Sequence, residues 1–148
     1  MKTIFLVSTL LLLFGQNILA IEAVSSSYLI KESTSWDGSA FEYAKGKPEI
    51  TIQKIDIRPE GNKAVSLAIH CHTSPVAAYV LKGSVQVIKP SGEHKLFKEG
   101  DAFIEVMNEW HKGIFTEDTE LIVFYAGEKD IPLSFKQEAK SPLSKACK

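Results

Sequence analysis

The sequence predicts an all-β fold, either a sandwich or a barrel. Between residues 49 and 126, β-branched runs alternate with turn-forming residues about every 8–12 positions. Nowhere in that range do apolar residues sustain the period of an amphipathic helix. Residues 21–48, by contrast, carry Ser and Thr runs and turn signals, so they read as an irregular lead-in to one β domain.

The expected strands follow one another in short runs. The first covers residues 49–57, and its isoleucines change parity between Ile52 and Ile55, which predicts a bulge at Gln53–Lys54. A turn at residues 58–62 ends this strand. The further strands are expected at residues 64–72, 78–81, 84–89, 95–98, 101–107 and 120–126.

The first twenty residues have the layout of a secretory signal peptide. Lys2 precedes an apolar run over residues 4–14, and the segment ends on the small residue Ala20, after which we expect cleavage. The apolar run is short for a membrane span, and no later segment approaches the required length of about 20 residues. The sequence therefore predicts an exported protein, periplasmic or secreted, with no membrane span after signal removal.

The mature chain carries little net charge. Removing residues 1–20 takes away one basic residue and no acidic one, so 16 basic residues face 18 acidic ones. No basic face is implied, and we expect neither nucleic acid nor an anionic membrane as a partner. The expected organisation is a signal peptide at 1–20, a lead-in at 21–48, a barrel at 49–127 and a tail at 128–148 that is loosely held from Lys136 onward.

Two of the four histidines stand one residue apart. In a strand, His70 and His72 point to the same face with their side chains about 7 Å apart. A third histidine from a neighbouring strand, His111, would complete a three-nitrogen metal site. The plain alternative is two polar residues at a strand end. The fourth histidine, His94, lies in a polar hairpin and is expected to be exposed.

The strand that carries this pair has two different faces. One is bulky and suits a core, whereas the other is small until it reaches the histidines, as a cavity wall requires. Cys71 belongs to the bulky face, so it is a core or disulfide cysteine rather than a metal ligand. Cys147 is the other cysteine, and export would allow one bridge between the two. The sequence leaves open whether that bridge forms.

A first motif comprises Gly61, His70, His72 and the hairpin entry Tyr79-Val80-Leu81-Lys82-Gly83, and a second motif runs from Gly100-Asp101 to His111. Together, these two motifs resemble those of the cupin superfamily. The resemblance covers residues 48–127 and is strongest to small, exported, single-domain bacterial cupins. It implies a double-stranded β-helix, or jelly-roll barrel, of antiparallel strands with a cavity at one mouth. A homodimer is also implied by the resemblance alone.

This chain departs from the cupin pattern at its metal ligands. Val76 stands where the family has a ligand glutamate, and Val106 and Asn108 replace the usual proline and glycine. A three-histidine set remains: His70, His72 and His111. Imidazole ligands suit iron, zinc, nickel and copper, and the loss of a carboxylate weakens the preference for manganese. Thiol dioxygenases of the cupin superfamily use a three-histidine iron site of this general kind.

Glu105 is the one acidic residue that could compensate. It lies in an apolar run six residues before His111. If it faces the cavity, it could serve as a fourth ligand, a hydrogen-bond acceptor for a histidine, or a general base. The alternative is an exposed strand position. Tyr79 could offer a hydroxyl to the same cavity.

The sequence supports two main functions and identifies no substrate. The first is a small-molecule metalloenzyme of the oxygenase, isomerase or lyase type that binds a divalent metal through the three histidines. The alternative is a non-catalytic module that binds a metal or a small ligand. A third reading is a redox-responsive protein that depends on Cys71 and Cys147.

Overall fold

Ten short strands and one 3₁₀ helix make up the described chain. The computed structural model describes residues 24–138 and 141–148, so the expected signal peptide lies outside the described residues. Within those residues, no helix is long and apolar enough to cross a membrane. The elements are β1 (Pro48–Ile57), β2 (Val65–Ser66), β3 (His70–Cys71), β4 (Val76–Lys82), β5 (Ser84–Ile88), β6 (His94–Lys98), β7 (Ala102–Ile104), β8 (Lys112–Phe115), β9 (Thr119–Glu128), β10 (Phe135–Lys136) and the 3₁₀ helix η1 (Leu143–Ala146).

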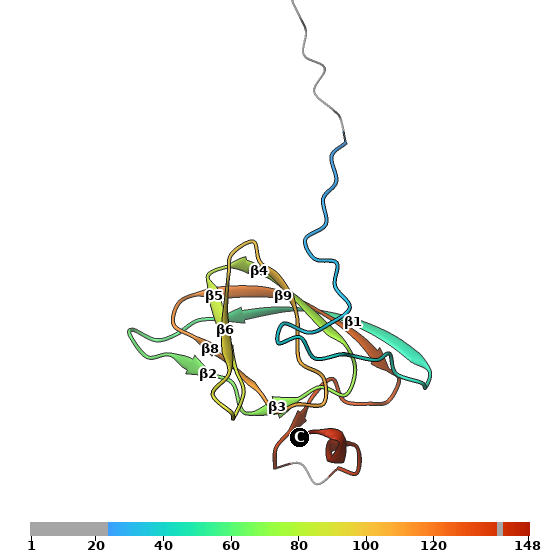
Figure 1. The fold of residues 1–148 in the computed structure, drawn as a ribbon. Coiled ribbons are helices and arrows are strands. Elements are labelled where there is room, and N and C mark those ends of the chain that lie inside the picture. The colour runs from blue at the N-terminus through green and yellow to red at the C-terminus, as the bar shows by residue number, and fades with distance from the viewer. Residues whose placement is uncertain (1–23, 139–140) are drawn as a thin grey trace, which may run out of the picture.

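The strands form two four-stranded sheets and one small sheet. One large sheet has the order β1-β9-β4-β7, the other has the order β2-β8-β5-β6, and β10 pairs with β3. Every pairing between these ten strands is antiparallel. Figure 1 shows the sheets curving around a common interior, with β3 at one end of the barrel. The predicted all-β class and the antiparallel jelly-roll architecture are therefore confirmed.

Apolar side chains from both large sheets face one another across the barrel interior. Strands β4, β5 and β9 contribute alternate residues to this core, as expected where one face of each strand is buried. The rings of Phe97 and Phe103 stack at a centroid distance of 3.9 Å. The buried core residues are Val76, Ala78, Val80, Val85, Val87, Phe97, Phe103, Phe115, Leu121, Val123 and Tyr125.

Two expectations about individual strands are wrong. Strand β1 pairs with β9 in unbroken register from Pro48 to Ile57, so there is no bulge at Gln53–Lys54. The isoleucines change parity because both faces of β1 carry them: Ile50 and Ile52 lie on the exposed face, whereas Ile55 and Ile57 pack against the core. The expected strand at residues 64–72 is split into β2 and β3.

The C-terminal segment is attached to the barrel, contrary to the expectation that it is loosely held. Lys136 pairs with His70 and Phe135 with Cys71 in the β10–β3 sheet. A disulfide joins Cys71 to Cys147. In Figure 1, this segment accordingly lies against β3.

Candidate metal centre

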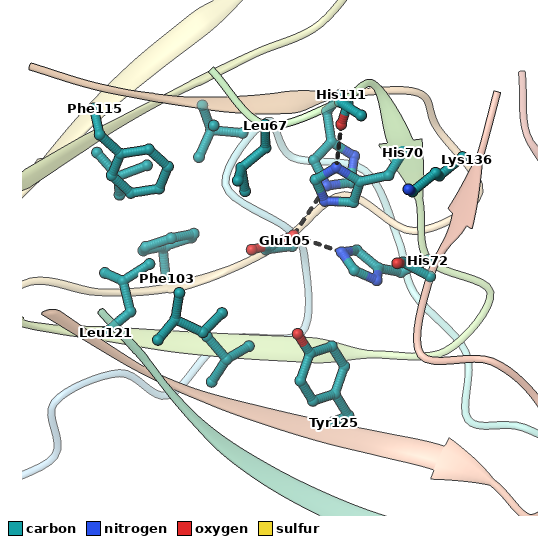
Figure 2. Close-up of a pocket in the computed structure, with 17 residues that line it drawn as sticks. Leu67, His70, His72, Phe103, Glu105, His111, Phe115, Leu121, Tyr125 and Lys136 are labelled. Carbon is teal, nitrogen blue, oxygen red and sulfur yellow. Dashed lines mark hydrogen bonds and ion pairs between the residues drawn. The ribbon is translucent and has the colours of Figure 1, made fainter. Parts of the chain in front are cut away.

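Four side chains from three chain segments meet at one end of the barrel interior. They are His70 and His72 from β3 and the residue that follows it, Glu105 just after β7, and His111 just before β8. One potential ligand atom from each lies within 4.8 Å of those of the other three. His72 and His111 are almost fully buried, at 3% and 1% exposure. The structure therefore brings together the three predicted histidines and adds Glu105 to them (Figure 2).

Main-chain pairing fixes the positions of the three histidines. His70 and His111 form an antiparallel bridge in which each N–H donates to the other's carbonyl oxygen at 2.9 Å. The carbonyl of His72 accepts the N–H of Asn108 at 2.8 Å. Asn108 has a positive φ of 60°, a conformation that asparagine tolerates better than most residues. The two histidine-bearing segments are thus held together by backbone hydrogen bonds.

Each imidazole has one nitrogen engaged by a backbone carbonyl. The Nδ1 atoms of His70, His72 and His111 lie 2.9, 2.7 and 2.9 Å from the carbonyl oxygens of Ala68, Leu133 and Glu109. A carbonyl only accepts, so Nδ1 carries the proton in each ring, and in the neutral imidazole the Nε2 lone pair is free. This hydrogen-bond pattern around metal-binding histidines orients the ring and fixes the tautomer.

Glu105 contributes a carboxylate from a different strand than the family pattern predicts. Its Oε2 atom lies 2.9 Å from Nε2 of both His72 and His111. Its backbone N–H donates to the carbonyl of Val76 at 2.9 Å. Glu105 therefore lies directly across from Val76, the position at which the cupin pattern has its ligand glutamate. The side chain is 15% exposed, which excludes the alternative of a solvent-facing position.

Burial and mutual charge set the protonation of this cluster. Burial, together with the neighbouring His111 and His72, lowers the pKa of His70 to about 4. Burial alone would lower the pKa of His72, but the charge and hydrogen bond of Glu105 raise it overall. Burial alone would raise the pKa of Glu105, but the His72 charge and the hydrogen bonds from His111 and His72 hold it well below its usual range. Glu105 is therefore an ionised acceptor.

The donor set fits a divalent metal ion. The Nε2 atoms of His72 and His111 both lie 2.9 Å from Glu105 Oε2. A metal ion bound here would accept the Nε2 lone pairs, and the carboxylate would balance part of its charge. Three imidazoles with one carboxylate suit transition metals such as iron, zinc, nickel and copper.

A cavity of about 370 Å³ adjoins the four side chains. Figure 2 shows it as having two ends: the histidine cluster at one, and Leu67, Phe103, Phe115 and Leu121 at the other. Tyr125 and Lys136 also line it, and sequence reasoning missed both. Burial and the charge of Glu105 raise the pKa of Tyr125 to about 12. Tyr79, whose hydroxyl the sequence suggested for this cavity, does not line it.

A buried cation supports the turn that precedes His111. Lys89 Nζ lies 2.7 Å from Asp37 Oδ2 and 2.8 Å from carboxylate oxygens of Glu93 and Glu109. Burial alone would lower the pKa of Lys89, but these three carboxylates raise it. Because the carbonyl of Glu109 accepts the His111 Nδ1 proton, this network connects the lead-in segment to the orientation of a predicted ligand.

No protein-family model matches the sequence, and no curated protein does. Several solved structures are similar in fold. A cupin-2 domain containing protein from Shewanella frigidimarina is 11% identical over 57% of this chain and 85% of its own, with a TM-score of 0.45. KdgF from Halomonas is 18% identical over 62% of this chain and 81% of its own, with a TM-score of 0.44. A salicylate 1,2-dioxygenase from Pseudoaminobacter salicylatoxidans is 17% identical, with a TM-score of 0.44 over 53% of this chain but only 20% of its own.

Proposed function

We propose that this protein is an exported metalloprotein that binds a divalent transition metal through His70, His72 and His111, with Glu105 as a fourth ligand. The observation that supports it best is the common tautomer of the three histidines. All three place a protonated Nδ1 on a backbone carbonyl and leave Nε2 available beside the same carboxylate. Glu105 then acts as a ligand rather than as a general base.

The adjoining cavity favours a small-molecule metalloenzyme over a module that only stores a metal. A volume of about 370 Å³ lies within the range of small-ligand sites, and the histidines and Glu105 form part of its wall. A ligand in the cavity would therefore lie against the metal-binding groups. A bound divalent ion supplies Lewis-acid or redox chemistry, according to its identity. The oxygenase, isomerase and lyase types remain the candidate reaction classes.

Two features support the proposed export to the periplasm or beyond. Residues 1–20 have the composition of a signal peptide. Cys71 and Cys147 are joined in a disulfide, which persists in oxidising compartments.

Metal analysis of the exported protein tests the proposal. We expect about one metal ion per chain in the wild type and almost none in a His70→Ala/His111→Ala variant, since half of the ligands are lost. His94→Ala is the matched control, because His94 is exposed and its ring bonds, among the described residues, only to the carbonyl of Gly92. Absence of metal from the wild type, even after incubation with iron, manganese, zinc, nickel and copper salts, would overturn the proposal. The identity of the ion would select among the reaction classes.

A further inference from the structure

Two polar groups on the cavity wall have no partner among the described residues. Lys136 has no ion pair with any described carboxylate, although it lines the cavity beside His70 (Figure 2). The hydroxyl of Tyr125 points into the cavity, and the tyrosine is only 6% exposed, yet it has no hydrogen bond with a described residue. Buried polar groups are nearly always hydrogen-bonded, so an unpartnered hydroxyl in a cavity wall indicates a site for a ligand oxygen.

The opposite end of the cavity is strongly apolar. Phe103, Phe115 and Leu121 lie there with exposures of 2%, 1% and 6%. None of these side chains offers a hydrogen bond to a ligand. A ligand that fills the cavity must therefore be apolar at one end and polar at the other.

The charges at the polar end favour an anionic group. Lys136 adds one positive charge, and the one carboxylate in the lining, Glu105, is already engaged by His72 and His111. A divalent ion bound by one carboxylate and neutral imidazoles would retain a positive charge of its own. A buried anion needs such compensation, whereas a ligand cation would meet only repulsion.

We propose that the cavity takes a small organic anion, a carboxylate with an aliphatic or aromatic body, whose charged group lies at the histidine end, where Lys136 and Tyr125 line the wall. This deepens the proposed function and rests on it for the role of the metal centre. Lys136 and Tyr125 act in specificity: Lys136 selects the charge, and Tyr125 donates a hydrogen bond to a ligand oxygen. The apolar end accommodates the body of the ligand.

Calorimetric titration of the exported protein with hexanoate, hexanamide and acetate tests this proposal. Hexanamide retains the chain of hexanoate without its charge, and acetate retains the charge without most of the chain. We expect hexanoate to bind about tenfold to a hundredfold more tightly than hexanamide, the range for hydrogen bonds to a charged group. It should also bind at least about tenfold more tightly than acetate, because its additional methylenes are buried.

Two variants locate the effect. Lys136→Met should weaken hexanoate binding about twofold to fivefold, because Lys136 is solvent-exposed, and leave hexanamide binding unchanged. Tyr125→Phe should weaken hexanoate binding about twofold to tenfold. Lys129→Met is the matched control, because Lys129 is an exposed lysine outside the cavity lining. The thermal unfolding midpoints of all variants are compared to confirm that each is folded.

The titrations are repeated on zinc-loaded and metal-free protein, with zinc content measured on the same samples. If the zinc-loaded wild type does not bind hexanoate, the anion proposal is overturned and the metal proposal stays intact. The same conclusion follows if the zinc-loaded wild type and Lys136→Met bind hexanoate with equal affinity. Protein that takes up no zinc but binds hexanoate in a Lys136-dependent manner supports the anion proposal, and the metal centre is then decided by the incubations with the other metal salts. Equal affinities for hexanoate and hexanamide would also overturn the anion proposal.

Discussion

Cys147 is disulfide-bonded to Cys71, the residue between the two histidines of the first motif, across a sequence separation of 76 residues. The bond is reinforced by main-chain contacts on the other histidine-bearing segment. The N–H of Lys148 donates to the carbonyl of Asn108 at 2.9 Å, and the N–H of Trp110 donates to the carbonyl of Lys148 at 3.2 Å. The C-terminal segment therefore connects the chain around His70 and His72 to the turn before His111.

Breaking this disulfide should destabilise the protein. We expect Cys147→Ala to lower the free energy of unfolding by about 2–5 kcal/mol, because the unfolded chain regains the freedom that the cross-link removed. Urea unfolding of the wild type and the variant measures the effect. A thiol reductant should bring the wild type to the stability of Cys147→Ala and leave the variant unchanged. Equal stability of the oxidised and reduced wild type would contradict this prediction.

The metal-free protein should lose stability as the pH falls from 6.5 to about 4. The pKa of His70 is lowered from 6.5 to about 4, chiefly by burial, so the unfolded chain binds a proton in this range and the folded protein does not. Stability is therefore complete above the unfolded pKa and declines as the pH falls toward the folded one. Chemical unfolding in the presence of a chelator, followed across this range, measures the slope.

The contribution of His70 to that slope can be isolated by substitution. His70→Gln should flatten the pH dependence between 6.5 and about 4, since the titrating group is absent. His94→Gln replaces an exposed histidine and should retain the wild-type slope. Identical slopes in His70→Gln and the wild type would show that another group is responsible.

Replacing Lys89 should cost far more stability than replacing Arg58, although each contacts three carboxylates. Lys89→Met leaves Asp37, whose side chain is only 4% exposed, without a cation and should cost about 3 kcal/mol. Arg58 is 48% exposed beside Asp56, Asp118 and Glu120, so Arg58→Met should cost less than about 1 kcal/mol. Unfolding free energies of both variants test the contrast. Similar losses for the two would mean that burial is not the deciding factor.

Much of the barrel could be predicted because alternation and turn chemistry are local signals. The missed strand β8 shows where they fail. Its inward positions are Gly113 and Phe115, and a glycine gives no apolar signal even though it lies against the Phe115 ring. Strand β10 is too short to produce a pattern, and its pairing depends on contacts with β3.

The residues of the candidate site could likewise be predicted from the sequence only in part. The histidines could be predicted because two share a strand face and the third follows a recognisable motif. Tyr125 could not, because it lies in an apolar strand and reads as core. Lys136 could not, because only the pairing of β10 with β3 brings a polar tail residue to the cavity. Glu105 stands out in the sequence as an acid in an apolar run, but its role depends on its position across from Val76 in the neighbouring strand.

Glu105→Gln should lower the pKa of His72 in the metal-free protein. The charge of Glu105 and its hydrogen bond raise the pKa of His72 against the effect of burial, and glutamine keeps the shape of the side chain without the charge. An NMR titration of the histidine ring protons in the wild type and the variant measures the change.

Glu105→Gln should also change how the stability of the metal-free protein depends on pH above 6.5. A raised His72 pKa contributes stability that is complete below its unfolded pKa of 6.5 and is lost as the pH rises through the folded value. Glu105→Gln should remove this loss above pH 6.5, because the imidazolium is no longer favoured in the folded protein. An unchanged His72 pKa in the variant would mean that Glu105 does not interact with His72 as an ionised carboxylate. The assignment of Glu105 as an anionic ligand would then fail with it.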